Sequence, residues 1–173
     1  MAERFNGYIR NQVVGVRNTL RLDRIVYSAK VGEWRRLPYP GHPKGCPNQG
    51  RPPFCPPNST ALVDYLDTAR PVYLVFEYFW LKNHADGMRE KHPGWTDRQC
   101  RNLLYWQGIV RAGLKRNVAA AMSILGCDVV TYCPEGQGVN VFATARLAGL
   151  ALDKTRRICI DHHIALIGSR AKL

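Results

Sequence analysis

Pro71-Val-Tyr-Leu-Val-Phe-Glu77 is a run of β-branched and aromatic residues that begins at a proline. A short apolar run of this composition is typical of a buried β-strand. We expect this strand to lie in the centre of a sheet, with the other elements arranged around it.

Helical patterns follow this strand. Residues 79–91 have helical character, which ends at the turn-forming His92-Pro93-Gly94. Thr96 and Gln99 match a capping box and predict the start of a long helix, and Gly126 is expected to end that helix in the left-handed conformation. Apolar residues at three-to-four spacing predict its core face: Leu103, Trp106, Ile109, Val110, Leu114, Val118, Ala121, Met122 and Leu125.

Shorter elements complete the pattern. Ser59 or Thr60 is expected to cap a short helix through about Leu66, and Asn140 to cap another through about Ala148. Short strands are expected at residues 128–132, 157–160 and 164–167. The predicted fold is α/β or α+β: a single domain over residues 1–173, in which one long helix and several shorter ones cover a small mixed sheet.

The composition is strongly basic. There are 25 Lys and Arg residues against 13 Asp and Glu residues, so the formal net charge is +12. A charge of this size attracts polyanions, and nucleic acid is the first candidate partner. The basic residues are scattered along the chain, however. A hydrated surface with more positive than negative side chains, and no nucleic-acid partner, explains the net charge equally well.

The sequence also predicts a compartment. The first residues lack the apolar segment of a signal peptide, and no apolar run approaches the roughly 18 residues that a membrane span needs. We therefore expect a cytoplasmic protein. In a reducing cytosol its six cysteines are expected to be thiols or metal ligands rather than disulfides.

Residues 44–58 form the loop that most directly suggests a ligand. This segment holds Cys46 and Cys55 among five prolines and two glycines, a composition that excludes a helix or sheet interior. Each cysteine precedes a proline, which favours an extended backbone at the cysteine. A stiff, pre-bent loop lowers the entropy lost when two thiolates converge on one ion or cluster.

A second cysteine pair, Cys127 and Cys133, flanks the strand expected at residues 128–132. The two pairs together would supply four thiolates, which suit zinc or an iron–sulfur cluster rather than magnesium or calcium. Both pairs are wider than the usual zinc knuckle, which favours a cluster, 4Fe–4S in the first instance, with zinc as the alternative. The competing interpretation is that cysteines are small buried hydrophobes, and we apply it to Cys100 and Cys159.

Other polar residues carry weaker signals. His42 lies close to Cys46 and is a candidate fourth ligand or hydrogen-bonding neighbour of a ligand. His162 and His163 are adjacent, so in an extended segment their rings point to opposite faces, where one serves as a ligand or proton donor or both are simply solvated. Asp128 and Glu135 border the second pair as acid–base candidates or as plain surface. No established catalytic motif is present, so the sequence does not decide whether the protein is an enzyme.

Three of these segments resemble a family. Cys46-Pro-x-x-Gly50, Cys55-Pro-Pro and the later Gly138-Val-Asn-Val-Phe run are similar to those of a widespread prokaryotic family of predicted metal-binding, cysteine-rich proteins of unknown function. Members carry further cysteines, one of them where this chain has Pro43 and a Cys-x-x-Cys cluster where it has only Cys127 and Cys133. The resemblance implies one metal site whose ligands are Cys46, Cys55 and Cys133, with Cys127 next.

Three functional hypotheses follow. The first is a cytoplasmic metalloprotein that holds one iron–sulfur cluster or zinc and has a redox, sulfur-chemistry or accessory role. The second is a zinc-stabilised basic module that binds nucleic acid through its charge of +12. The third is a metal-free domain whose cysteines are merely buried.

Overall fold

The computed structural model describes residues 12–34, 36–38, 44–46, 50, 55, 58–153 and 158–172. Its centre is a four-stranded sheet of β1 (Thr19–Leu22), β2 (Val72–Phe79), β3 (Val129–Thr131) and β4 (Asp161–Gly168), in the order β1-β2-β4-β3. All three strand pairings are antiparallel, which decides between the two predicted classes in favour of α+β. The predicted central strand is confirmed, because β2 pairs with a strand on each side.

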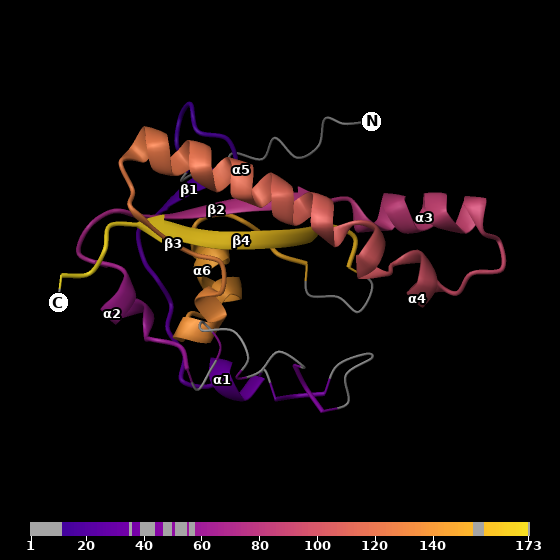
Figure 1. The fold of residues 1–173 in the computed structure, drawn as a ribbon, viewed down its shortest axis with the longest axis horizontal. Helices are drawn as coiled ribbons and strands as arrows, with labels where there is room; N and C mark the ends of the chain where they lie inside the picture. The colour runs from indigo at the N-terminus through magenta and orange to yellow at the C-terminus, as the bar shows by residue number, and fades with distance from the viewer. Residues whose placement is uncertain are drawn as a thin grey trace.

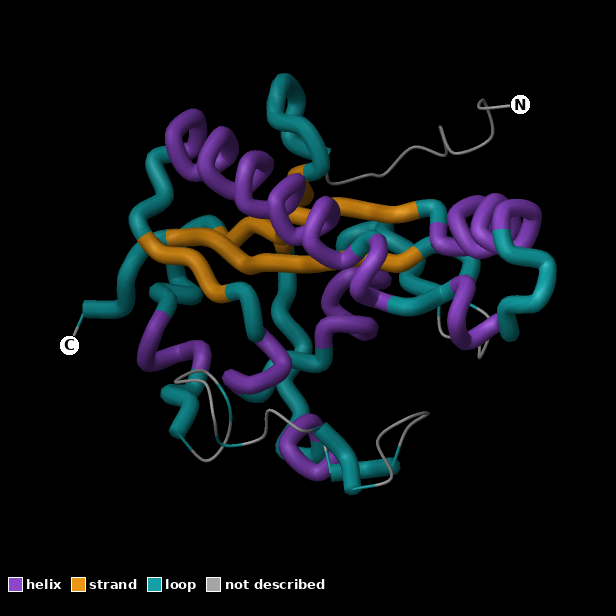
Figure 2. The backbone as a smooth tube through the Cα atoms, turned by 45° about the vertical axis from the view of Figure 1, so that its right-hand side comes forward, coloured by secondary structure: helices purple, strands orange, loops and turns teal. Residues whose placement is uncertain are grey.

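Helices cover both faces of this sheet (Figure 1). The long helix α5 (Gln107–Leu125) crosses one face, while α2 (Leu62–Tyr65) and α6 (Val141–Leu147) lie against the other, with α1 (Val31–Trp34) farther out. Helices α3 (Leu81–Lys91) and α4 (Asp97–Cys100) extend beyond the end of β2, as the rotated view in Figure 2 also shows. None of the described helices combines the length and the apolarity needed to cross a bilayer.

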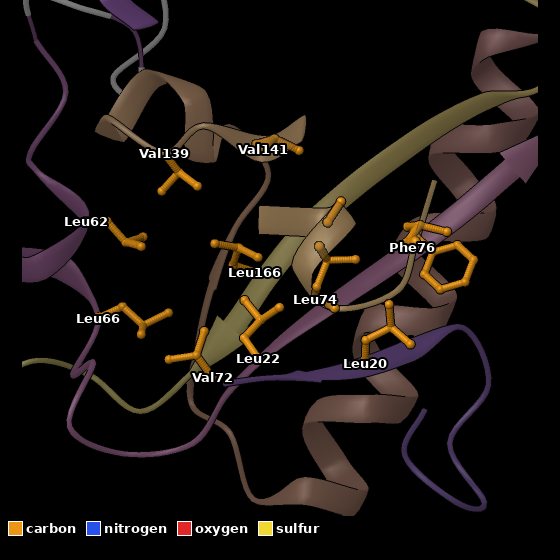
Figure 3. Packing of buried hydrophobic residues seen from close by; sticks show 13 residues of the cluster. Leu20, Leu22, Leu62, Leu66, Val72, Leu74, Phe76, Val139, Val141 and Leu166 are labelled. Carbon is orange, nitrogen blue, oxygen red and sulfur yellow. The ribbon is translucent and has the colours of Figure 1, made fainter. Parts of the chain in front are cut away.

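The alternation of side chains along β2 builds a core on each face. Val72, Leu74 and Phe76 point away from α5 into a cluster that Leu166 of β4 joins. Figure 3 shows how side chains from β1, α2 and the start of α6 complete this cluster. Val75 points the other way and packs with residues of β4 and α5: Ala165, Ile167, Leu114, Val118 and Ala121. The sheet therefore depends on burial of both of its faces.

Two predictions about the long helix need correction. The capping box at Thr96 and Gln99 is present, but it begins the four-residue α4, and a 3₁₀ turn, η1 (Leu103–Tyr105), separates α4 from α5. The core stripe consequently begins at Trp106, and Ile109 is 68% exposed. A capping box satisfies the backbone N–H groups of one turn and says nothing about how far the helix continues. Gly126 does end α5 in the left-handed conformation, with φ 66°.

Two shorter elements also differ from the predictions. Ala61, and not Ser59 or Thr60, precedes α2, and no side chain caps this helix. Residues 161–168 form one strand instead of two strands on either side of residues 161–163, because residues 161–163 also pair with β2. Asn140 does cap α6, accepting a hydrogen bond from the backbone N–H of Ala143 at 3.1 Å.

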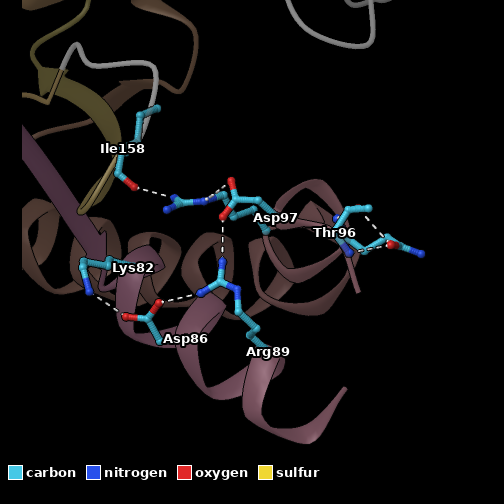
Figure 4. A network of polar contacts seen from close by, with 8 residues as sticks. Lys82, Asp86, Arg89, Thr96, Asp97 and Ile158 are labelled. Carbon is cyan, nitrogen blue, oxygen red and sulfur yellow. Dashed lines mark hydrogen bonds and ion pairs between the residues drawn. The ribbon is translucent and has the colours of Figure 1, made fainter. Parts of the chain in front are cut away.

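An exposed ionic network connects α3, α4 and the segment before β4 (Figure 4). Asp86 pairs with Lys82 at 2.6 Å and with Arg89 at 3.0 Å, and Arg89 reaches Asp97 at 2.9 Å. Arg101 then pairs with Asp97 and donates to the carbonyl oxygen of Ile158 at 2.7 Å. Although each exposed pair contributes little by itself, the network fixes α4 beside the end of the sheet.

Candidate functional site

The proline-rich loop ends against the turn that follows Cys133. Cys133 begins the 3₁₀ turn η2 (Pro134–Gln137), and its carbonyl oxygen accepts from the N–H of Gly136 at 2.9 Å. Ser59 donates its hydroxyl to the carbonyl oxygen of Gly136 at 2.6 Å. The Ser59 bond attaches the end of the first cysteine segment, residues 44–59, to the second cysteine segment, residues 133–137.

Within the loop, Asn58 stabilises the backbone around Cys55. Its N–H donates to the carbonyl oxygen of Cys55 at 2.9 Å, and its side-chain amide donates to that of Gly50 at 3.1 Å. Cys55 is only 5% exposed, so this loop cysteine is buried. Among the described residues of this segment, Gly45 and Gly50 both adopt positive φ, a backbone conformation that glycine takes readily in turns.

Cys46 lies on a groove of about 380 Å³ that the two cysteine segments share. Glu135, two residues after Cys133, lines the same groove. The other lining residues come from α1, from the start of α6 and from the segment before it: Val31, Trp34, Val139, Asn140, Val141 and Phe142. The first predicted cysteine and the turn that begins at Cys133 thus face a common space.

Cys127 lies apart from this groove. It follows the last turn of α5 and packs against the apolar cluster between α5 and the sheet. Cys127 and Cys133 lie at opposite ends of β3, and at about 3.3 Å per strand residue their separation is on the order of 15–20 Å. Burial, with a smaller contribution from Asp128, raises the pKa of the Cys127 thiol and so disfavours the thiolate that a metal needs.

The structure does not assemble the predicted four-thiolate cage. All six cysteines are among the described residues, and each is a thiol without a disulfide bond. In the described part of the chain, no three His, Cys, Asp or Glu side chains are gathered closely enough to hold a metal ion. The described residues therefore form no assembled metal site in the arrangement seen, and β3 separates Cys127 from Cys133.

The remaining cysteines and Asp128 have structural positions. Cys100 is fully buried, as predicted. Cys159 is exposed, and its prediction as a buried strand residue is wrong, because β4 begins only at Asp161. Asp128 accepts a hydrogen bond from the backbone N–H of Arg170 at 3.0 Å, which connects β3 to the residues after β4.

The histidine predictions have separate outcomes. His42 lies outside the described residues. His162 and His163 lie on opposite faces of β4, as expected for an extended pair: the ring of His162 lies near Phe76, and that of His163 near Trp106 on the α5 side. Burial lowers the pKa of His162, although Asp161 and Asp153 partly oppose this effect.

One polar cluster was not predicted. Glu77 is the β2 partner of His163, and Asn117 of α5 donates to its carboxylate at 3.0 Å. Asp161 Oδ2 lies 3.2 Å from His163 Nε2, an ion-pair distance without the alignment of a hydrogen bond. The sequence contained a signal for this cluster. Side chains alternate between the two faces of a strand, so Glu77 lies on the same covered face as Val75, where a carboxylate needs hydrogen-bond partners.

No protein-family model, curated protein or solved structure matches this sequence. The resemblance to cysteine-rich metal-binding proteins therefore stays a prediction, and the candidate site rests on the geometry of this chain alone.

Proposed function

We propose that this is a cytoplasmic metal-binding protein in which Cys46, Cys55 and Cys133 are the ligands of one zinc ion or iron–sulfur cluster. The main support is the shared groove: Cys46 lines it together with Glu135, which belongs to the turn that Cys133 begins. Thiolates are soft ligands and select zinc or iron–sulfur clusters.

Cys127 is left out of this ligand set. Two sulfur ligands of one zinc ion lie about 4 Å apart, because each is about 2.3 Å from the metal, whereas β3 holds Cys127 on the order of 15–20 Å from Cys133. Three cysteines leave one coordination position, for which the carboxylate of Glu135 is the nearest candidate that the groove supplies. When bound, the metal would supply either a structural crosslink or an electron-transfer centre.

Metal binding in this proposal is coupled to a loop movement. Because no three described ligands are gathered, the two cysteine segments have to close on the metal. Ser59 already joins the end of one segment to the turn that begins the other, which limits the movement required. Coupling of this kind makes the binding free energy part of the folding free energy.

The test is metal analysis of protein purified without oxygen. Stoichiometric iron and sulfide in a brown protein would identify a cluster, and stoichiometric zinc in a colourless one would identify zinc. Substitution of Cys46, Cys55 or Cys133 by serine is expected to remove most of the metal, while Cys127→Ser and Cys100→Ser retain it. A wild-type protein without metal, or equal loss in Cys127→Ser, would reject the proposal.

The nucleic-acid hypothesis is the second candidate. A net charge of +12 supports it without indicating where a nucleic acid binds. The groove beside Cys46 is a candidate location for such binding.

A further inference from the structure

The groove beside Cys46 presents two partly exposed aromatic rings. Trp34 of α1 is 45% exposed and Phe142 of α6 is 43% exposed, and both line the groove. The rest of the lining is mainly apolar, from Val31, Val139 and Val141. A concave site with flat apolar side chains suits a flat ring, because stacking contacts depend on matched planar faces.

The walls of this groove are held together by backbone hydrogen bonds. The N–H of Ser28 donates to the carbonyl oxygen of Gly138 at 3.0 Å, and that of Asn140 donates to Val26 at 2.7 Å. These bonds join the segment before α1 to the segment before α6. Both rings are therefore carried by a connected framework, which lowers the ordering cost of binding.

Basic side chains flank the groove-lining residues. Lys30 precedes Val31, Arg36 follows Trp34 by two positions, and Lys44 precedes Cys46 by two; all three are exposed. The carboxylates of these segments are Glu33, on the exposed side of α1, and Glu135, inside the groove. The three basic residues suit an anionic ligand. The part of that ligand inside the groove should be neutral or should donate hydrogen bonds to the carboxylate of Glu135.

We propose that this groove binds an unpaired base of a single-stranded nucleic acid. Trp34 and Phe142 stack on the base, and Lys30, Arg36 and Lys44 contact the neighbouring phosphates. Aromatic platforms beside basic residues are how proteins bind single strands without sequence preference. A duplex is excluded because its bases are already paired and stacked.

The inference is tested separately from the metal proposal, although Cys46 and Glu135 line the same groove. Neither ring is a metal ligand, so Trp34→Ala and Phe142→Ala should keep the metal content of the wild type. Failure of one proposal therefore leaves the other testable.

Fluorescence anisotropy with labelled oligo(dT) and oligo(U) at low salt tests the proposal. Trp34→Ala and Phe142→Ala are each expected to weaken binding at least about fivefold. Trp34→Phe keeps a ring and should keep most of the affinity. Trp80→Ala is the matched control, since Trp80 is also 45% exposed but does not line the groove.

The charge contribution has its own control. Alanine at Lys30, Arg36 and Lys44 together should reduce the slope of log affinity against log salt by about 2. Alanine at Arg111, Lys115 and Arg116, all exposed on α5 across the sheet, should leave this slope nearly unchanged. Tighter binding of duplex than of single strand, equal losses in Trp34→Ala and Trp80→Ala, or no binding by the wild type would each overturn the proposal.

Discussion

Gly113 of α5 lies directly against Glu77 of β2. A β carbon at position 113 would lie 2.8 Å from Glu77 Oε2 and 3.0 Å from its Cγ. The carboxylate cannot swing away without loss, since Asn117 Nδ2 donates to Oε2 at 3.0 Å and the N–H of Tyr78 donates to Oε1 at 3.2 Å. A glycine therefore lets the long helix approach a strand that carries an acid on its covered face.

Gly113→Ala is expected to lower the free energy of unfolding by about 1–3 kcal/mol through this clash, although alanine by itself favours a helix by about 1 kcal/mol. Gly108→Ala on the same helix meets no atom within 4 Å and should stabilise the protein instead. Urea unfolding measures both. Equal stability of the two variants would contradict the packing argument.

The buried hydroxyl of Thr144 accepts a hydrogen bond from the backbone N–H of Val26 at 3.0 Å and so connects α6 to the segment after β1. Thr144→Val should leave this N–H without a partner and cost about 1–3 kcal/mol of unfolding free energy. Thr144→Ser keeps the acceptor and should cost less. Thermal unfolding compares the two, and a valine variant more stable than the serine variant would disprove the role of the bond.

Stability should fall in mild acid because of His162. Burial holds its pKa below the usual value, so between that lowered pKa and about 6.5 the unfolded chain binds more protons than the folded one. With respect to His162, the unfolding free energy therefore has its full value above about pH 6.5 and decreases as the pH falls below that value. His162→Gln should flatten this decrease in urea titrations at several pH values.

His84 adds an effect of the same sign, because burial and the charge of Lys91 both lower its pKa. Some decrease in stability should therefore remain in His162→Gln. The double variant with His84→Gln should be flatter still, and an unchanged pH profile in both variants would contradict the assignment.

Chelator treatment should separate the cysteines. If the site is nearly saturated, removing the metal lowers stability by about 3–4 kcal/mol, which corresponds to a fall in melting temperature of several degrees. Wild type and Cys127→Ser should both show this fall with a zinc or iron chelator, whereas Cys133→Ser should melt at the lower temperature with or without it. A chelator response retained in Cys133→Ser would remove that residue from the ligand set.

Locally determined elements were the easiest to predict. The strand at residues 72–79, the left-handed cap at Gly126 and the Asn140 cap each depend on a few adjacent residues. Helix length and strand pairing depend on distant partners. The pairing of residues 161–163 with the end of β2 produced one long strand, and no local signal in this polar segment indicated it.

The candidate site was harder to predict for the same reason. The described residues of the proline-rich segment, 44–46, 50, 55 and 58, lie outside helices and strands as its composition predicted, and Ser59 just after it bonds to Gly136 after Cys133. Sequence proximity grouped Cys127 with Cys133, but a strand between two residues separates their side chains. The ligand set itself stays a prediction until metal is measured.

The position of β4 between β2 and β3 has a consequence for synthesis. Every other described helix and strand precedes β4 in the chain, yet Leu166 completes the packing on one side of the sheet and Ile167 on the other. A nascent chain on the ribosome thus carries β2 and β3 without their shared neighbour. Until this last strand emerges, both apolar surfaces remain open to chaperones, and native structure has to form after translation of nearly all of these residues.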